Sequence, residues 1–240
     1  MAAQFADRDV TESMVSYPSE GVTVKAYLIG PKPKGKYPAI IIVQEWWGLN
    51  DHIKDVAWRY AREGYAAIAP DLYSRLGHKV TASPDEAGKL MNMLQQADGL
   101  KDLNATVAYL KTVDGVDPSR LGVTGFCMGG SYALMLPCVN RDIKAAAPYY
   151  GQVPNPDTPL RGLAAPVLYI YGEDDGWITK GDVQRLRDAL KKYNKLGEVK
   201  TYPGCPHAFF NDTRKDVYKP VEAQDAWKRT LAFFAQHLKG

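Results

Sequence analysis

Short apolar runs alternate along the chain with longer stretches in which apolar residues return every three or four positions. The short runs have the length of buried strands and lie at 37–43, 65–69, 120–124, 145–150 and 166–171, with a further strand near 199–202. The stretches with helical spacing cover 51–63, 85–96, 100–113, 131–136, 183–193 and 227–238. Strands that alternate with helices predict an α/β fold with a mostly parallel, doubly wound sheet, whose ligand site lies beyond the carboxyl ends of the strands.

The N-terminal part of the chain departs from this alternation. Within 12–30, apolar and polar residues alternate on either side of 18–21, a segment rich in turn-forming residues. This pattern predicts an antiparallel hairpin at one edge of the sheet. Asp51 is expected to cap the helix that follows it. We interpret 1–240 as a single domain, because 240 residues are enough for one large core.

The composition is that of an ordinary globular protein. Hydrophobic residues make up 45% of the chain and charged residues 24%, and the formal net charge of +3 is too small to predict a nucleic-acid or membrane surface. No apolar run approaches the roughly 20 residues that span a bilayer. Three cysteines give no disulfide framework, and residues 1–7 lack the basic and apolar regions of a signal peptide, so a cytoplasmic location is expected. We expect no cofactor and no metal, and a monomer or small homo-oligomer.

The segment 123–130 carries the first candidate for chemistry. Cys127 stands between a strand-like run and a helix-like run, with Gly125 two residues before it and Gly129 two residues after it. Glycines at this spacing allow a sharp strand-to-helix turn that holds the central side chain at a helix N-terminus, the arrangement called a nucleophile elbow. The helix dipole favours a thiolate there. The alternative is a small buried cysteine in a glycine-rich turn.

Two further candidates follow later core strands. Asp174 and Asp175 come after the strand at 166–171, and His207 comes just after the last strand. The order nucleophile, acid, histidine is that of the α/β hydrolases, and all three elements fall on loops at one edge of the predicted sheet. Asp175 is favoured as the acid by its position shortly before Trp177, and Asp174 stays as the alternative. A plain surface histidine is the competing interpretation of His207, while His52, His78 and His237 are expected to be solvated.

Glu45 is a carboxylate at the end of a buried strand, between Val43 and the pair Trp46–Trp47. Removing a carboxylate from water is costly unless it is paired, hydrogen-bonded or protonated, so Glu45 needs a partner or a raised pKa. Its functional interpretation is a group that exchanges a proton in the site. The structural interpretation is a carboxylate satisfied by backbone amides.

Taken in order, five motifs resemble the dienelactone hydrolase family of the α/β hydrolases. They are Gln44-Glu45-Trp46-Trp47-Gly48, Ala69-Pro70-Asp71-Leu72-Tyr73, Gly125-Phe126-Cys127-Met128-Gly129-Gly130, the acidic turn at Asp175, and Pro206-His207-Ala208-Phe209. The resemblance spans nearly the whole chain and implies a single-domain α/β-hydrolase fold. It also implies a triad of Cys127, His207 and Asp175, with Glu45 near the resting thiol and able to take its proton. The oxyanion hole of the family falls on the backbone N–H groups of Met128 and Trp46.

The resemblance implies a hydrolase that cleaves a small-molecule ester or lactone through a cysteine acyl-enzyme. One departure bears on the substrate. The family's dienelactone-specific members hold the substrate carboxylate with an arginine four residues after the histidine, where this chain has Asn211. Neutral short-chain esters or lactones are therefore expected to be used at least as well as anionic ones. The candidates for substrate contact are Trp47, Tyr73, Arg75, Phe209 and Asn211.

Two alternatives to this function stay open at the level of sequence. A thioesterase would use the same nucleophile on a different acyl donor. A thiol-based redox sensor or a ligand-binding protein would keep the hydrolase fold without turnover.

Overall fold

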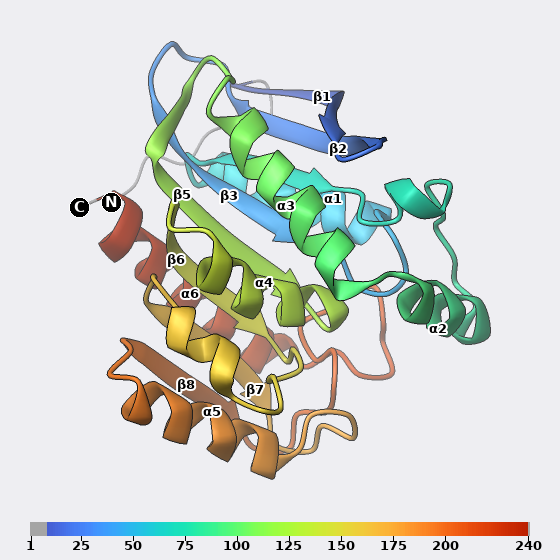
Figure 1. Ribbon diagram of the computed structural model, residues 1–240, viewed down its shortest axis with the longest axis vertical. Coiled ribbons are helices and arrows are strands. Elements are labelled where there is room, and N and C mark those ends of the chain that lie inside the picture. The colour runs from blue at the N-terminus through green and yellow to red at the C-terminus, as the bar shows by residue number, and fades with distance from the viewer. Residues whose placement is uncertain (1–8, 240) are drawn as a thin grey trace. The chain divides into compact units, whose positions relative to one another are not determined.

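The computed structural model describes residues 9–239 (Figure 1). The strands are β1 (Val10–Ser19), β2 (Val22–Pro31), β3 (Tyr37–Val43), β4 (Ala66–Pro70), β5 (Val116–Phe126), β6 (Ile143–Tyr149), β7 (Val167–Gly172) and β8 (Gly197–Tyr202). The helices are α1 (Asp51–Arg62), α2 (Pro84–Met93), α3 (Gln96–Leu110), α4 (Met128–Val139), α5 (Lys180–Lys192) and α6 (Pro220–Leu238), with short 3₁₀ helices η2 (Ser74–Leu76) and η3 (Thr158–Gly162).

The chain forms two compact units, one up to Gly122 and one from Val123 onward. Strand β5 runs through the boundary, so each unit holds part of it. The segment 1–7, which lacks signal-peptide character in the sequence, lies outside the described residues.

The first unit has the strand order β1-β2-β4-β3. The predicted N-terminal hairpin is confirmed: β1 and β2 pair antiparallel from Val10 opposite Pro31 to Ser19 opposite Val22. Strand β2 is also antiparallel to β4, and β3 and β4 are parallel. Strand β3 is buried over nearly its whole length, as the continuous apolar run predicts for a strand covered on both faces.

Two helices cover opposite faces of these strands in Figure 1, α3 in front and α1 behind. Helix α1 packs on β2, β3 and β4 through the apolar side that its spacing predicts, which includes Ile53, Val56 and Tyr60. The expected cap was wrong by one residue. Asn50 is the N-cap, because its Oδ1 accepts the N–H of Ile53, and Asp51 lies in the first turn beside the helix dipole.

The second unit has the strand order β5-β6-β7-β8, and β6, β7 and β8 pair parallel. Helix α4 lies in front of β6 and α6 lies behind it (Figure 1). The hydroxyl of Tyr149 at the end of β6 bonds to Thr230 Oγ1 of α6 at 2.7 Å, both fully buried. A capping box between Thr179 and Asp182 begins α5.

The architecture is therefore an α/β fold with a mostly parallel sheet and an antiparallel N-terminal edge, as the sequence predicts. The parallel strands bring 44–48 and 71–83 to the carboxyl ends of β3 and β4 in the first unit. They bring Cys127, Asp175 and His207 to the carboxyl ends of β5, β7 and β8 in the second. Between residues 9 and 239, no helix is long and apolar enough to cross a membrane.

Candidate active site

Cys127 lies at the turn between β5 and α4. Its backbone has φ 55° and ψ −119°, a conformation that side-chain-bearing residues rarely adopt. Its N–H donates to the carbonyl of Tyr149 at 3.2 Å, which ties the turn to β6. The side chain is 8% exposed. A non-glycine residue held at positive φ between a strand and a helix N-terminus is the geometry of a nucleophile elbow.

Gly130, three residues after Cys127, and Gly151 are required by close backbone contact. A Cβ added at Gly130 would overlap the carbonyl oxygen of Tyr149, and one added at Gly151 would overlap the backbone of Gly130. The first turn of α4 therefore packs directly against the chain that leaves β6. Met128 is the first residue of α4, so its N–H is at the end of the helix where amides have no acceptor within the helix itself.

His207 and Asp175 form a hydrogen-bonded pair in the second unit. The Nδ1 of His207 and the Oδ2 of Asp175 are 2.7 Å apart, and the Asp175 side chain is fully buried. The other oxygen of Asp175 accepts the N–H groups of Trp177 at 2.7 Å and Ile178 at 2.9 Å. Two amides and one imidazole thus fix this carboxylate. Asp174 is exposed, and its N–H donates to the carbonyl of Cys205. Of the two aspartates, Asp175 is thus the one that the structure places beside His207.

The other ring nitrogen of His207 has a different environment. Nε2 is buried and has no hydrogen-bond partner among residues 9–239. The ring stands edge-on to Tyr150 at 5.0 Å and to Trp177 at 5.3 Å between centroids. Tyr150 directly follows Tyr149, the residue that holds the Cys127 amide. With Nδ1 bound to Asp175, Nε2 is the nitrogen that can exchange a proton.

Glu45, Trp46 and Trp47 lie in the first unit, in the turn after β3. Glu45 is 1% exposed, which agrees with the expected burial. The Glu45 carbonyl accepts the N–H of Gly48 at 3.3 Å, so Trp46 and Trp47 are the central residues of a β-turn. Their rings are edge-to-face neighbours, with centroids 4.9 Å apart and an interplanar angle of 64°.

Arg75, a candidate for substrate contact, is bound to a carboxylate of the protein itself. Its Nε and one terminal nitrogen donate to Asp102 at 2.9 Å and 2.8 Å, and the Asp102 side chain is fully buried. Ser19 donates to the same carboxylate at 2.6 Å. A guanidinium that forms two bonds to a buried aspartate is a structural anchor, and its charge is largely compensated.

Phe209 and Asn211 also have partners inside the second unit. Phe209 is fully buried and its ring packs against Tyr150 and Tyr202. Asn211 is 1% exposed, and its Oδ1 accepts both the N–H and the hydroxyl of Thr213. The structure gives both residues a role in packing the chain after His207.

Sequence reasoning missed a second histidine–aspartate pair, in the first unit. The Nδ1 of His78 and the Oδ2 of Asp71 are 2.9 Å apart, while the His78 side chain stays 33% exposed, in line with the expected solvation. Burial raises the pKa of Asp71, and the bond to His78 opposes that shift. His52 was also expected to be solvated and is instead 3% exposed. The apolar neighbours of Asp71 in 69–73 were a signal that this carboxylate is buried.

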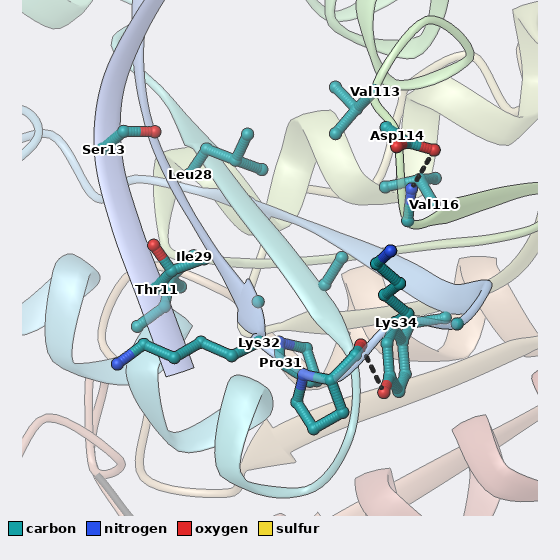
Figure 2. A pocket seen from close by; sticks show the side chains of 16 residues that line it. Thr11, Ser13, Leu28, Ile29, Pro31, Lys32, Lys34, Val113, Asp114 and Val116 are labelled. Carbon is teal, nitrogen blue, oxygen red and sulfur yellow. Dashed lines mark hydrogen bonds between the residues drawn. The ribbon is translucent and has the colours of Figure 1, made fainter. Parts of the chain in front are cut away.

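The first unit also has a cavity of about 630 Å³. Figure 2 shows side chains that line it. Its lining includes Tyr37 and Ala66, the first residues of the β3 and β4 regions, together with Lys32 and Lys34. Ligand sites of parallel sheets lie at the carboxyl ends of strands. The cavity is at the amino ends and contains none of the candidate site residues, so its size does not make it the active site. Among the described residues, no three His, Cys, Asp or Glu side chains are grouped to hold a metal ion.

The fold and the strand-to-helix turn at Cys127 define the class, an α/β hydrolase. Comparisons with known proteins agree. The Dienelactone hydrolase family profile matches residues 24–238. Protein usf of Aquifex pyrophilus is 38% identical over 234 residues, which covers 94% of this chain and 98% of that protein. A "Putative carboxymethylenebutenolidase" of Synechocystis sp. is 35% identical over 245 residues, which covers 96% and 99%.

A solved structure is also similar along nearly the whole chain. The "Putative Dienelactone Hydrolase" from Klebsiella pneumoniae has a TM-score of 0.88 and 36% sequence identity, covering 95% of this chain and 99% of that chain. The chain belongs to the dienelactone hydrolase family.

Proposed function

We propose that this protein hydrolyses small carboxylic esters or lactones through a thioester formed on Cys127. Family membership makes the chain a carboxylic ester or lactone hydrolase, and the cysteine mechanism is the further step. The observation that carries it is the pair of His207 and Asp175 at 2.7 Å, next to Tyr150, which directly follows the residue whose carbonyl accepts the Cys127 N–H.

Each half of the reaction needs one proton transfer. The Cys127 thiolate attacks the carbonyl carbon, and the tetrahedral intermediate collapses as the ester C–O bond breaks. The proton lost by the Cys127 thiol, received first by Glu45, reaches His207 Nε2 before this collapse, and the leaving alkoxide takes it from Nε2. Water then attacks the thioester and gives a proton back to Nε2, the acid is released, and the thiolate is restored. Asp175 holds the ring with Nδ1 toward itself, so Nε2 faces the reaction.

Backbone amides are proposed to stabilise the oxyanion of both intermediates. The donors are the N–H groups of Met128, the first residue of α4, and of Trp46 in the turn after β3. Loss of one such donor usually raises the barrier by about 2.7–4 kcal/mol. Two donors on separate, well-held turns are suited to this role because they need no reorganisation during the reaction.

Glu45 is proposed to receive the proton of the resting Cys127 thiol when substrate binds. The support is its burial at 1% exposure and its place in the motif 44–48 that resembles the family. Burial favours proton uptake by a carboxylate, because the free energy of desolvation is lower for the neutral carboxyl than for the charged one.

Neutral short-chain esters and lactones are the proposed substrates, with no strong preference for anionic ones. Asn211 stands where dienelactone-specific members have an arginine, and the Arg75 guanidinium is bound to Asp102. A substrate carboxylate would therefore have to compete with Asp102 for Arg75.

Burst kinetics with p-nitrophenyl acetate test the mechanism. A burst of p-nitrophenol that equals the enzyme concentration, followed by steady turnover, is expected when acylation is faster than deacylation. A burst with no turnover would contradict the proposal and indicate a reactive thiol that cannot deacylate. Much faster turnover of an acyl-coenzyme A than of any oxygen ester would instead make the protein a thioesterase. Cys127→Ala should show neither burst nor turnover, and Cys138→Ala should show both.

A further inference from the structure

The β-turn at 45–48 controls the direction of one proposed oxyanion donor. The carbonyl and the N–H of a trans peptide point in opposite directions. The bond from the Gly48 N–H to the Glu45 carbonyl at 3.3 Å therefore also sets the direction of the Trp46 N–H, which belongs to the same peptide group. Contacts that fix the turn at 45–48 therefore also fix the direction of the Trp46 N–H.

The segment 71–81 holds the turn at three points in the same unit. The Tyr73 hydroxyl donates to the Trp46 carbonyl at 2.8 Å. The N–H of Thr81 donates to the Trp47 carbonyl at 3.0 Å. Gly48 has φ +93°, and a Cβ there would overlap the carbonyl oxygen of Lys79, so the two backbones are in direct contact. Of the three contacts, only the one from Tyr73 is made by a side chain.

Tyr73 is itself fixed in place. Its side chain is fully buried. Its N–H donates to Asp71 Oδ1 at 2.9 Å, and the other oxygen of Asp71 faces His78 Nδ1 at 2.9 Å. The N–H of Asp71 donates to the carbonyl of Lys25 on β2 at 2.8 Å. The phenol is thus anchored to the sheet through Asp71 and reaches the turn with its hydroxyl.

We propose that Tyr73 is a positioning residue: its bond to the Trp46 carbonyl, which belongs to the next peptide group, holds the turn at 45–48 and thereby keeps the Trp46 N–H aligned with the oxyanion. The inference rests on the proposed function in one respect, the role of the Trp46 N–H as a donor. Complete loss of an oxyanion donor lowers kcat by about 10²–10³-fold. A donor that is present but poorly aligned keeps part of its effect, so removal of the Tyr73 hydroxyl should lower the acylation rate at least about tenfold.

Two reactions of the Cys127 thiol distinguish a misaligned Trp46 N–H from a general disturbance of the site. Acylation of Cys127 by p-nitrophenyl acetate passes through an oxyanion. Alkylation by iodoacetamide forms the S–C bond as the C–I bond breaks and iodide leaves, so it forms no oxyanion. Tyr73→Phe should therefore slow acylation at least tenfold and leave alkylation within about twofold of wild type, with kcat falling more than KM changes.

A third readout and a matched control complete the test. A trifluoromethyl ketone forms an oxyanion adduct with a thiolate, so Tyr73→Phe should weaken its inhibition by a factor close to the loss of acylation. Tyr17→Phe is the control, because Tyr17 is also buried in this unit and its hydroxyl bonds Thr106 Oγ1 at 2.7 Å. That variant should keep all three values within about twofold.

Asp71→Ala provides a second, independent variant, since it removes the acceptor of the Tyr73 amide and leaves the hydroxyl. It should repeat the selective loss of acylation, and it keeps the proposal testable if Tyr73→Phe fails to fold. Unchanged acylation in Tyr73→Phe, or an equal fall of acylation and alkylation, would overturn the role of Tyr73. Acylation that persists in Cys127→Ala would instead overturn the proposed function.

Discussion

The three thiols of this chain have different surroundings, and only one lies at a nucleophile elbow. Burial raises the pKa of Cys138 to about 12 and that of Cys205 to about 11. Both side chains are therefore protonated thiols, and poor nucleophiles, at neutral pH. Cys127 lies at the N-terminus of α4, where the helix dipole favours the thiolate.

This difference predicts selective alkylation. At pH 7.5, iodoacetamide should modify Cys127 in the folded protein and leave Cys138 and Cys205 unmodified. Because a raised pKa keeps the thiol protonated until the pH approaches that value, labelling of Cys205 should become appreciable only toward pH 11. Peptide mapping by mass spectrometry measures each site. Preferential labelling of Cys205 at pH 7.5 would contradict the assignment of the nucleophile.

The two neighbouring aspartates predict a second contrast. Asp175→Asn should lower kcat at least about a hundredfold, since the amide no longer holds the imidazolium that forms on His207. Asp174→Asn should stay within about threefold of wild type, because the Asp174 side chain is exposed and its backbone N–H, which the substitution keeps, donates to the carbonyl of Cys205. Steady-state kinetics on p-nitrophenyl acetate compare them. The reverse ranking would move the acid to Asp174.

For individual residues, the sequence predicted the candidate site best where a residue type has few roles in proteins. An acidic turn after one core strand and a histidine after the next led to the pair of Asp175 and His207 that the structure brings together. The sequence was uninformative about long-range partners. Nothing near Arg75 indicates that it binds Asp102, which is 27 positions away and is brought to it by the packing of α3. His78 and Asp71 were missed because a loop histidine is usually solvated.

At the scale of elements, the elbow depends on the close contact between the first turn of α4 and the chain after β6. Gly130→Ala should destabilise the protein by at least about 2 kcal/mol, because the new Cβ overlaps the Tyr149 carbonyl and the backbone must move. Activity should fall as the elbow is displaced. Thermal or urea unfolding gives the change in the free energy of unfolding.

Gly181→Ala is the matched control for this substitution. Gly181 lies in the first turn of α5, where a Cβ meets Thr179 Oγ1 at an ordinary 3.5 Å. Alanine is the better helix former, so this variant should have unchanged or slightly increased stability, by up to about 1 kcal/mol. Equal stability of Gly130→Ala and wild type would show that the elbow tolerates a side chain there.

The elements themselves were largely predictable, because apolar runs and helical spacing persist over many residues. Strand β3 begins and ends where its apolar run does. The ends of other elements were less predictable. Strand β5 begins at Val116, before the apolar run, and its first half carries polar residues that are partly exposed. Asn50 rather than Asp51 caps α1, a choice between two good capping residues that backbone geometry alone decides.

At the scale of the whole molecule, the account predicts how the protein treats substrate charge. With Arg75 bound to Asp102 and Asn211 in place of an arginine, kcat/KM for a neutral lactone should equal or exceed that for a matched lactone with a carboxylate. Progress curves at several salt concentrations measure both. A large preference for the anionic lactone would show that a cation of the protein binds the substrate carboxylate.

Fold class was predictable at this scale, since the alternation of strands and helices extends along the chain and the family motifs occur in order. The substrate was not predictable, because specificity for charged substrates depends on which charged side chains are already paired with an opposite charge of the protein. Arg75 illustrates this: it is a cation in the sequence and one half of a buried ion pair in the structure.

Trapping the covalent intermediate tests the central claim most directly. His207→Ala should acylate slowly and deacylate hardly at all, so acid quenching after incubation with p-nitrophenyl acetate should leave an acetyl group on the protein. The account predicts that peptide mass spectrometry finds this group on Cys127, and that hydroxylamine at neutral pH removes it as expected of a thioester. An acetyl group on another residue, or none in a variant that still releases p-nitrophenol, would contradict it.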